Sequence, residues 1–279
     1  MALASSIWGG LFVATRVAVQ VIPPVPLVWL RYVTATGALF IFGQLAHVSW
    51  KIKKEHWKLL AGVGLIGYTF SIVTQETGTM LTSAQTGSIV TASTPAFMVI
   101  FARIWLKERL TLGRVLSVVL ASIGVLLIVA DPDNFQITGW EGGVCLMTAA
   151  VTWAVMSVWL KLLPGYSPIT LTFYGVLTAV VVLALPALSW IGQADAALFA
   201  PAEIWGSVLY MGIISTSCGF VLWNKGLLYM DASIGGLFLF FQPLVGTFLG
   251  WVLLGEPITL YFWLGSALIV GGVVLAMRS

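Results

Sequence analysis

The 279-residue chain is too apolar for a water-soluble protein, since 59% of its residues are hydrophobic and only 8% carry a charge. Ordinary globular domains have roughly 45–50% apolar and about 25% charged residues. The mean hydropathy is +1.03, and the net charge of +3 gives no reason to expect nucleic acid as a partner. The composition therefore predicts an all-α integral membrane protein whose main solvent is lipid.

Polar breaks divide the chain into ten apolar segments, each close to the roughly 20 residues that a membrane-spanning helix needs. In chain order, we expect transmembrane helices at 3–21, 26–46, 57–76, 82–105, 112–129, 140–161, 168–190, 203–224, 231–254 and 259–277. The connections between these segments are short, which leaves no room for a soluble domain.

The loops alternate in charge along the chain. The loops after the second, fourth, sixth and eighth segments, with the flanking helix ends and the C-terminus, carry Lys51, Lys53, Lys54, Lys58, Arg103, Lys107, Arg109, Arg114, Lys161, Lys225 and Arg278. The opposite loops carry Asp131, Asp133, Glu141, Asp195, Glu203 and Glu256, with no Lys or Arg. Because basic loops remain inside, we expect a multi-pass protein of the inner (plasma) membrane with both termini in the cytoplasm.

The two halves of the chain resemble each other at positions 148 apart. The pattern P-x12-E-x2-T-x12-G occurs twice, as Pro95-Glu108-Thr111-Gly124 and as Pro243-Glu256-Thr259-Gly272. Each half, 1–130 and 139–279, then holds five helices, and an odd number makes the second copy lie upside down in the bilayer. Inverted repeats of this kind are a recurring plan of secondary transporters, with the site near the midplane between the copies.

These motifs give the chain a resemblance to the EamA-type members of the drug/metabolite transporter superfamily. It is carried by Trp8-Gly9 with Arg16, Leu30-Arg31, Pro95, Lys107-Glu108-Arg109-Leu110-Thr111 and Gly255-Glu256-Pro257-Ile258-Thr259, and it covers nearly the whole chain. The resemblance implies a ten-helix transporter of small organic metabolites, often an exporter. Some members, such as the YddG-type proteins, look like exporters of aromatic and other amino acids. Thr91-Ala92-Ser93-Thr94-Pro95 stands where that branch has an aromatic-rich stretch.

Aromatic and polar side chains gather near the middle of several predicted helices. Rings with a few hydroxyls suit an amphipathic organic solute. Counting along the helices at 1.5 Å per residue puts a candidate substrate-binding set near the midplane: Tyr68, Ser93, Thr94, Trp153, Ser217, Phe238, Phe241 and Gln242. We expect Trp8, the repeat partner of Trp153, to line the cytoplasmic side. The alternative for each residue is a bond within its own helix or a ring that faces lipid.

Pro95 and Pro243 fall near the middles of two predicted helices. A proline there removes one backbone hydrogen bond and kinks the helix. In a membrane the freed carbonyl must meet a hydroxyl, a water molecule or a ligand. We interpret the two prolines as gating hinges because the repeat duplicates them, and a static bend for packing is the alternative.

Arg16, Arg31 and Glu76 are ionisable residues within predicted helices, where charge is costly and often functional. They form a candidate charge site, because Arg suits a substrate carboxylate. The alternative is a structural ion pair with Glu76. The sequence has no isolated carboxylate at the bilayer centre, which disfavours a proton relay but leaves coupling through Glu76 open.

Glu108 and Glu256 end two predicted helices, and Thr111 and Thr259 stand where the next helices begin. We expect the threonines to act as N-caps and each Glu to accept hydrogen bonds from that next helix start. His47 and His56 have no Cys, Asp or His partner at ligand spacing, so we expect no metal ion and no cofactor.

The sequence predicts a secondary transporter that exports small organic metabolites by alternating access, with aromatic or other hydrophobic amino acids favoured. A proton-coupled exporter of drugs or other metabolites is an alternative. An intramembrane enzyme is a more remote alternative, since the sequence has no H-E-x-x-H and no G-x-S-x-G motif. ATP-driven pumping is not expected, because the sequence has no G-x-x-x-x-G-K-[ST] phosphate-binding loop. The expected partners are a small-molecule substrate and the lipid bilayer. A monomer should suffice for transport, and the oligomeric state is left open.

Overall fold

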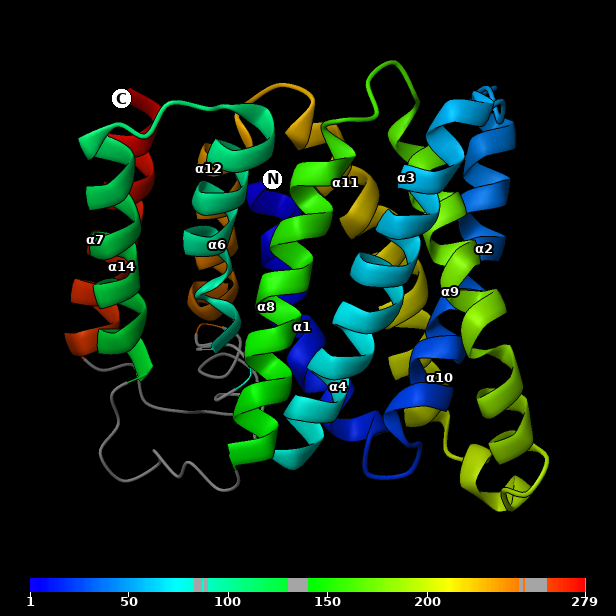
Figure 1. The fold of residues 1–279 in the computed structure, drawn as a ribbon. Coiled ribbons are helices and arrows are strands. Elements are labelled where there is room, and N and C mark those ends of the chain that lie inside the picture. The colour runs from blue at the N-terminus through cyan, green and yellow to red at the C-terminus, as the bar shows by residue number, and fades with distance from the viewer. Residues whose placement is uncertain (83–86, 88–89, 130–139, 246–247, 249–259, 279) are drawn as a thin grey trace.

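The computed structural model describes residues 1–82, 87, 90–129, 140–245, 248 and 260–278. Every regular element among these residues is a helix, and each predicted segment contains one (Figure 1). The elements are α1 (Ala2–Ala18), α2 (Pro24–Leu45), η1 (Lys54–His56), α3 (Trp57–Gly62), η2 (Val63–Ser71), α4 (Ile72–Leu81), α6 (Thr94–Phe101), η3 (Ala102–Leu106), α7 (Leu112–Val129), α8 (Trp140–Leu160), α9 (Pro168–Ile191), η4 (Ala196–Phe199), α10 (Ala202–Leu209), η5 (Tyr210–Cys218), α11 (Gly219–Leu227), α12 (Ala232–Leu237), η6 (Phe238–Phe240) and α14 (Leu260–Arg278). The all-helical part of the prediction is confirmed for the described residues.

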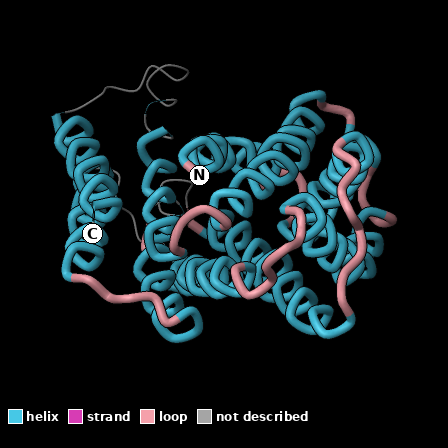
Figure 2. Tube along the Cα trace, turned by 90° about the horizontal axis from the view of Figure 1, so that it is seen from above, coloured by secondary structure: helices cyan, strands magenta, loops and turns pink. Residues whose placement is uncertain are grey.

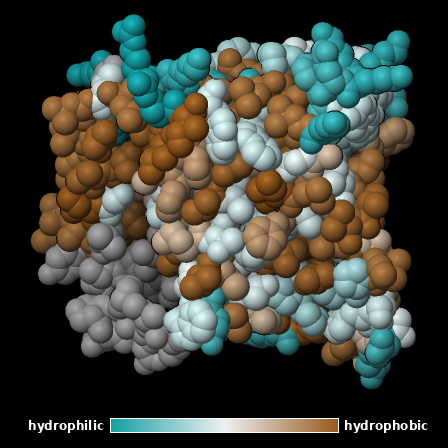
Figure 3. Space-filling view, in the orientation of Figure 1, coloured by the Kyte–Doolittle hydropathy of each residue, from teal (hydrophilic) through white to brown (hydrophobic). Residues whose placement is uncertain are grey.

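Several of these helices are built for a bilayer. Five are long and apolar enough to cross a membrane: Pro24–Leu45, Lys54–Leu81, Trp140–Leu160, Pro168–Ile191 and Ala202–Leu227. The remaining predicted segments hold shorter apolar helices in their described parts. Figure 3 shows apolar residues across the middle of one face and hydrophilic residues at its upper and lower edges. Outward-facing leucines such as Leu185, which is 83% exposed, suit a lipid environment rather than water.

α7 and α14 pack side by side at one edge of the bundle, as Figures 1 and 2 show from two directions. Glycines allow the close approach. A Cβ on Gly124 would lie 2.6 Å from the carbonyl oxygen of Gly265, and one on Gly272 would lie 2.8 Å from that of Ser117. Small residues let membrane helices come together in this way. The two contacts involve equivalent positions, since Gly124 and Gly272, like Ser117 and Gly265, are 148 apart.

The rest of the bundle packs in a matching pattern. α2 lies against α9, η2 lies against α9, and η5 lies against α2. Glycines again make room, because a Cβ on Gly64 would lie 2.6 Å from the Cβ of Thr178, and one on Gly212 would overlap Thr34. The first-half segment η2 therefore packs against α9 of the second half, and its second-half counterpart η5 packs against α2 of the first half.

The long helices Lys54–Leu81 and Ala202–Leu227 each contain a π-helical stretch, η2 and η5. A π-helical insertion is rare and is frequent at functional sites. A cavity residue follows each stretch within two positions: Ile72 comes directly after η2, and Phe220 is the second residue after η5. The wider turns thus lie directly before the part of each helix that faces the cavity.

The helices depart from regular α-geometry just before both prolines. The chain turns at Ala92 and Ser93, and Pro95 lies in the first turn of α6. Proline cannot donate to the Thr91 carbonyl, and the Thr94 hydroxyl donates to it instead at 2.6 Å. Before Pro243 the helix tightens into the 3₁₀ turn η6. The predicted local breaks are present, and the role of the prolines as hinges stays a prediction.

Glu108 caps a different helix from the one that we predicted. Its carboxylate accepts hydrogen bonds from the backbone N–H groups of Ala232 at 2.8 Å and Ser233 at 3.2 Å, at the start of α12 rather than α7. Thr111 does cap α7, since its hydroxyl accepts from the Arg114 N–H at 3.2 Å. The prediction chose the next helix in sequence, whereas the start of α12 is the one within reach. Glu256 and Thr259 lie outside the described residues.

Candidate substrate cavity

A cavity of about 450 Å³, including its open mouth, lies between the two halves of the chain. The first half contributes Trp8, Leu11, Arg31, Ile72, Gln75, Thr91 and Thr94. The second half contributes Ala149, Ala150, Trp153, Phe220, Leu239 and Gln242. Ligand pockets typically have apolar walls with a few polar groups. This cavity has the lining expected for a small amphipathic molecule.

Aromatic rings form one wall of the cavity. Trp8 and Trp153 meet edge to face, with ring centroids 5.4 Å apart and an interplanar angle of 88°. Phe220 lies 5.7 Å from Trp8 and 5.2 Å from Trp153. Trp223, which is fully buried, supports Trp8 from behind at 5.4 Å. Contacts between rings at these distances add stability beyond simple burial, so the wall is a firm surface.

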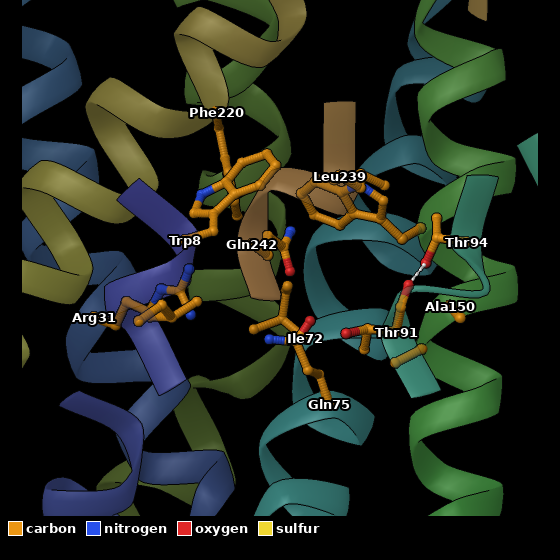
Figure 4. A pocket seen from close by; sticks show the side chains of 13 residues that line it. Trp8, Arg31, Ile72, Gln75, Thr91, Thr94, Ala150, Phe220, Leu239 and Gln242 are labelled. Atoms are coloured by element: carbon orange, nitrogen blue, oxygen red, sulfur yellow. Dashed lines mark hydrogen bonds between the residues drawn. The ribbon is translucent and has the colours of Figure 1, made fainter. Parts of the chain in front are cut away.

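Polar groups face the space in front of this wall. Figure 4 shows the side-chain amides of Gln242 and Gln75 directed toward the region between Arg31 and Thr91. Thr91 donates from its hydroxyl to the Gly87 carbonyl at 2.7 Å. The cavity therefore combines an aromatic surface with amide and hydroxyl groups and one guanidinium.

Arg31, Glu76 and Thr216 form what we call the charged cluster. Arg31 is fully buried, its Nη1 lies 3.0 Å from Glu76 Oε1, and its Nε donates to Thr216 Oγ1 at 2.6 Å. A buried cation without a counter-charge would cost several kcal/mol, so Glu76 allows Arg31 to be buried. The ion pair that was the structural alternative is therefore present, yet Arg31 also lines the cavity. Of Arg16, the structure describes the backbone in α1 but not the side chain.

Tyr68, Thr172 and Asn224 form what we call the neutral cluster. Asn224 Nδ2 donates to Tyr68 Oη and to Thr172 Oγ1, both at 2.9 Å. The backbone carbonyl of Tyr68 also accepts from the hydroxyl of Tyr32 at 2.8 Å. Tyr68 is fully buried in these contacts and is not part of the cavity lining.

Other predicted site residues also lie outside the lining. The Ser93 hydroxyl donates to the Val90 carbonyl at 2.7 Å, and the Ser217 hydroxyl donates to the Gly212 carbonyl at 3.0 Å. Phe238 and Phe241 stack on each other at 6.1 Å and pack toward the core formed with α7 and α14. The structure thus brings together Thr94, Trp153 and Gln242 from the predicted set, with Arg31 from the charge site and Trp8.

Sequence reasoning missed several lining residues, and the repeat could have found some of them. Ile72 and Phe220 are 148 apart, and so are Thr91 and Leu239. An apolar residue inside a transmembrane segment carries no signal by itself. Comparing both copies at each position would have marked these pairs. Gln75, beside Glu76, is a polar residue in a predicted helix that polarity alone could have singled out.

Among the described residues, no group of His, Cys, Asp and Glu side chains could hold a metal ion. Within the cavity lining, the hydroxyls of Thr94 and Thr91 each donate to a backbone carbonyl. The described cavity therefore offers groups for binding and orientation.

The apolar helices indicate a multi-pass membrane protein, and sequence comparison shows that its class is a transporter. The model of the EamA-like transporter family matches residues 1–130 and 140–278. The chain therefore belongs to the EamA-like transporter family. The family and the relatives described next are transporters rather than enzymes.

Similar proteins cover nearly the whole chain. An uncharacterized transporter of Archaeoglobus fulgidus is 29% identical over 100% of this chain and 97% of its own. The uncharacterized transporter YoaV of Bacillus subtilis is 28% identical over 96% and 92%. A protein of Streptantibioticus cattleyicolor called "Probable terminal-alkyne amino-acid exporter" is 26% identical over 97% and 90%. A solved structure described as "Crystal structure of protein" shares the fold, with a TM-score of 0.79, 23% identity, and coverage of 99% of this chain and 94% of that one.

Proposed function

We propose that this transporter exports small amphipathic metabolites, with aromatic or other hydrophobic amino acids as the favoured substrates. It works by alternating access between two inverted five-helix repeats, residues 1–130 and 139–279, which together cross the membrane ten times. The aromatic wall of the cavity and its amide groups support a solute of this kind. One relative at 26% identity carries the name of an amino-acid exporter, which supports the same substrate class.

One observation carries the proposal: the cavity is lined by residues at equivalent positions of the two copies. The pairs are Ile72 with Phe220, Thr91 with Leu239 and Thr94 with Gln242, each 148 apart, and Trp8 with its partner Trp153. Equivalent residues of two copies meet each other only close to the axis that relates the copies. This pairing supports a substrate site at the interface of the two repeats, where inverted-repeat transporters bind their substrate.

The packing elsewhere supports the same architecture. The π-helical stretches η2 and η5 begin 147 residues apart, and the glycine contacts of α7 with α14 use equivalent residues from both helices. A common origin of the halves explains why such uncommon local features occur twice.

We further propose that the transporter lies in the inner (plasma) membrane with both termini in the cytoplasm, as the basic loops suggest. In Figure 1 the C-terminus and the start of α3, which follows the Lys-rich loop, lie at the same upper end of the bundle. Single cysteines introduced as Lys53→Cys and Asp133→Cys test the orientation. We expect a membrane-impermeant reagent to label the second from outside intact cells and the first only after permeabilisation.

Counterflow in proteoliposomes tests the substrate class. We expect labelled phenylalanine, tryptophan or leucine to accumulate in vesicles that are preloaded with the same unlabelled amino acid. Sugars and small polar amino acids should exchange more slowly. Exchange of cationic drugs alone, driven by a pH gradient, would instead support a proton-coupled drug exporter and contradict the proposal.

A further inference from the structure

Two hydrogen-bond donors in the cavity lining have no partner among the described residues. They are Nη2 of Arg31 and Nε1 of Trp153. Arg31 is fully buried and Trp153 is 8% exposed. Leaving a buried donor unbonded costs free energy, and the cost is greater when the donor carries charge. Buried polar groups in native structures are nearly always bonded, so an exception beside a cavity is a candidate position for a ligand atom.

The two residues that carry these donors both lie against Phe220. The guanidinium carbon of Arg31 is 5.7 Å from the centroid of the Phe220 ring, and the Trp153 ring is 5.2 Å from it. The remaining contacts of Arg31 fix its orientation, because Nη1 pairs with Glu76 and Nε donates to Thr216. The unpartnered nitrogen, Nη2, is therefore held in place rather than carried by a flexible side chain. Because it is already ordered, ligand binding loses little side-chain entropy there.

The repeat partner of Trp153 provides an internal contrast. Trp8 lines the same cavity, but its indole N–H donates to the Ser215 carbonyl at 3.0 Å. One tryptophan thus uses its N–H to hold α1 against η5, whereas the N–H of the other is buried without a partner among the described residues. Of the pair, Trp153 is therefore the one whose N–H a ligand atom could satisfy.

We propose that Arg31 Nη2 and Trp153 Nε1 form a subsite for the carboxylate group of the transported solute. A carboxylate accepts hydrogen bonds from several donors, and such bonds to an ionised acceptor are roughly twice as strong as those between neutral groups. The solute's apolar part lies on the wall of Trp8, Trp153 and Phe220. This assignment rests on the proposed function, and it names the substrate group that the cavity recognises.

The charge balance of the cavity favours a zwitterion. Glu76 already neutralises Arg31, so an ion with a net charge would add uncompensated charge to a buried space. An amino acid brings its own ammonium group, which the side-chain oxygens of Gln75, Gln242 or Thr91 can accept from. The carboxylate fixes the orientation of the solute, and the ammonium group balances its charge.

Binding to the purified protein tests the subsite. We would titrate L-phenylalanine and 3-phenylpropionate, which carry a carboxylate, and L-phenylalaninol and phenethylamine, which lack one, by isothermal titration calorimetry at constant pH and chloride concentration. We expect both carboxylates to bind at least tenfold more tightly than the two compounds without one, as the strength of a hydrogen bond to a charged group predicts. L-Phenylalanine should bind more tightly than 3-phenylpropionate because it is neutral overall.

Matched variants locate the effect. Trp153→Phe keeps an aromatic ring and removes the free N–H, so the preference for 3-phenylpropionate over L-phenylalaninol should fall roughly fivefold to tenfold. Trp8→Phe makes the same change at the repeat partner and should leave that preference unchanged. Arg31→Lys retains a charge for Glu76 but removes the second guanidinium nitrogen, and the preference should fall by at least as much as in Trp153→Phe.

The outcomes separate this proposal from the proposed function. Equal binding of 3-phenylpropionate and L-phenylalaninol, or no carboxylate binding at millimolar concentration, overturns the subsite even if amino acids exchange in proteoliposomes. An unchanged preference in Trp153→Phe overturns it as well. Carboxylate-selective binding that Trp153→Phe abolishes supports the subsite, and it does so even if no amino acid is exchanged and the proposed export function fails.

Discussion

The charged cluster and the neutral cluster occupy equivalent positions in the two halves, yet they differ in what they offer to the cavity. Glu76 and Asn224 are 148 apart, and so are Tyr68 and Thr216. Each cluster links two helices of one half to a π-helical stretch of the other half. In the charged cluster Arg31 reaches the cavity and keeps one nitrogen without a partner among the described residues, whereas no member of the neutral cluster is among the described residues that line the cavity.

The comparison teaches that equivalent positions give the two halves a similar framework, whereas the residues that differ between the clusters make the cavity asymmetric. Two identical clusters would make a symmetric cavity, in which a solute could bind equally well in either of two opposed orientations. One half has a guanidinium–carboxylate pair where the other half has a carboxamide and hydroxyls. A cationic hydrogen-bond donor therefore lies on only one side of the cavity. Under the proposed subsite, a solute with one anionic end would then bind in one orientation.

The largest expected effect comes from removing one member of the charged cluster. Glu76→Ala leaves Arg31 buried without its counter-charge, which should destabilise the protein by about 3–5 kcal/mol. Asn224→Ala, the equivalent change in the neutral cluster, should cost about 1–3 kcal/mol because it removes hydrogen bonds without unpairing a charge. Thermal unfolding in detergent and the yield of folded protein measure both. A loss for Asn224→Ala as large as that for Glu76→Ala would contradict the distinction between the clusters.

The double variant Arg31→Met with Glu76→Leu sharpens the same comparison. Replacing a buried ion pair by apolar side chains is often neutral or stabilising, so most of the stability lost in Glu76→Ala should return. Binding of 3-phenylpropionate should not return, because the guanidinium is absent. Recovery of both properties together would mean that Arg31 has no part in binding.

The prolines test whether the halves act as equal moving parts. Pro95→Ala and Pro243→Ala restore a backbone donor in equivalent helices, and we expect the double variant to exchange substrate several-fold more slowly at normal abundance. The Pro95 variant should show the smaller effect of the two single changes, because the Thr94 hydroxyl already occupies the Thr91 carbonyl. Counterflow rates normalised to folded protein measure the change. Unchanged exchange in the double variant would remove the prolines from the mechanism.

The cap on α12 offers a smaller effect at one end of the bundle. Glu108 is bonded to the first N–H groups of α12, and Arg114 pairs with Glu108 and with Asp231. Glu108→Ala should therefore destabilise the protein by about 1–2 kcal/mol, as the loss of a helix cap does. Thr111→Ala, which removes the cap of α7, is the matched control with a loss of about 1 kcal/mol. A stability of Glu108→Ala equal to that of the wild type would mean that water replaces the carboxylate without cost.

The sequence was informative where a pattern repeats and uninformative where a contact is decided in three dimensions. Hydropathy located the helices, and the duplicated proline marked the breaks before Pro95 and Pro243. Distance from the helix ends gave the depth of Tyr68 and Ser217 but not the direction in which they face. Both residues lie within the π-helical stretches η2 and η5, where the directions of the side chains do not follow the regular 3.6-residue period of an α-helix.

The sequence also could not predict which side chains bond to each other across the bundle. Glu108 caps α12, whose start is more than a hundred residues away along the chain. Arg31 could be assigned to Glu76 by elimination among few charges, but the hydrogen bond to Thr216 depends on η5 lying against α2. The free indole N–H of Trp153 carries no sequence signal at all, because Trp8 matches it in the repeat and differs only in the carbonyl that it meets.

The smallest expected effect concerns the aromatic wall. Trp153→Leu keeps an apolar surface but removes the edge-to-face contacts with Trp8 and with an aromatic ligand, each worth about 0.5–1.5 kcal/mol beyond burial. Because Leu also lacks the N–H, all carboxylate ligands should weaken together, and aromatic ones should weaken further. The ratio of the affinities for L-phenylalanine and L-leucine isolates the ring, since the carboxylate is common to both. We expect this ratio to fall roughly threefold to tenfold in Trp153→Leu and to stay unchanged in Trp153→Phe, which keeps a ring. A ratio that falls equally in both variants would mean that ligand rings do not lie against Trp153, and the wall would then have only a packing role.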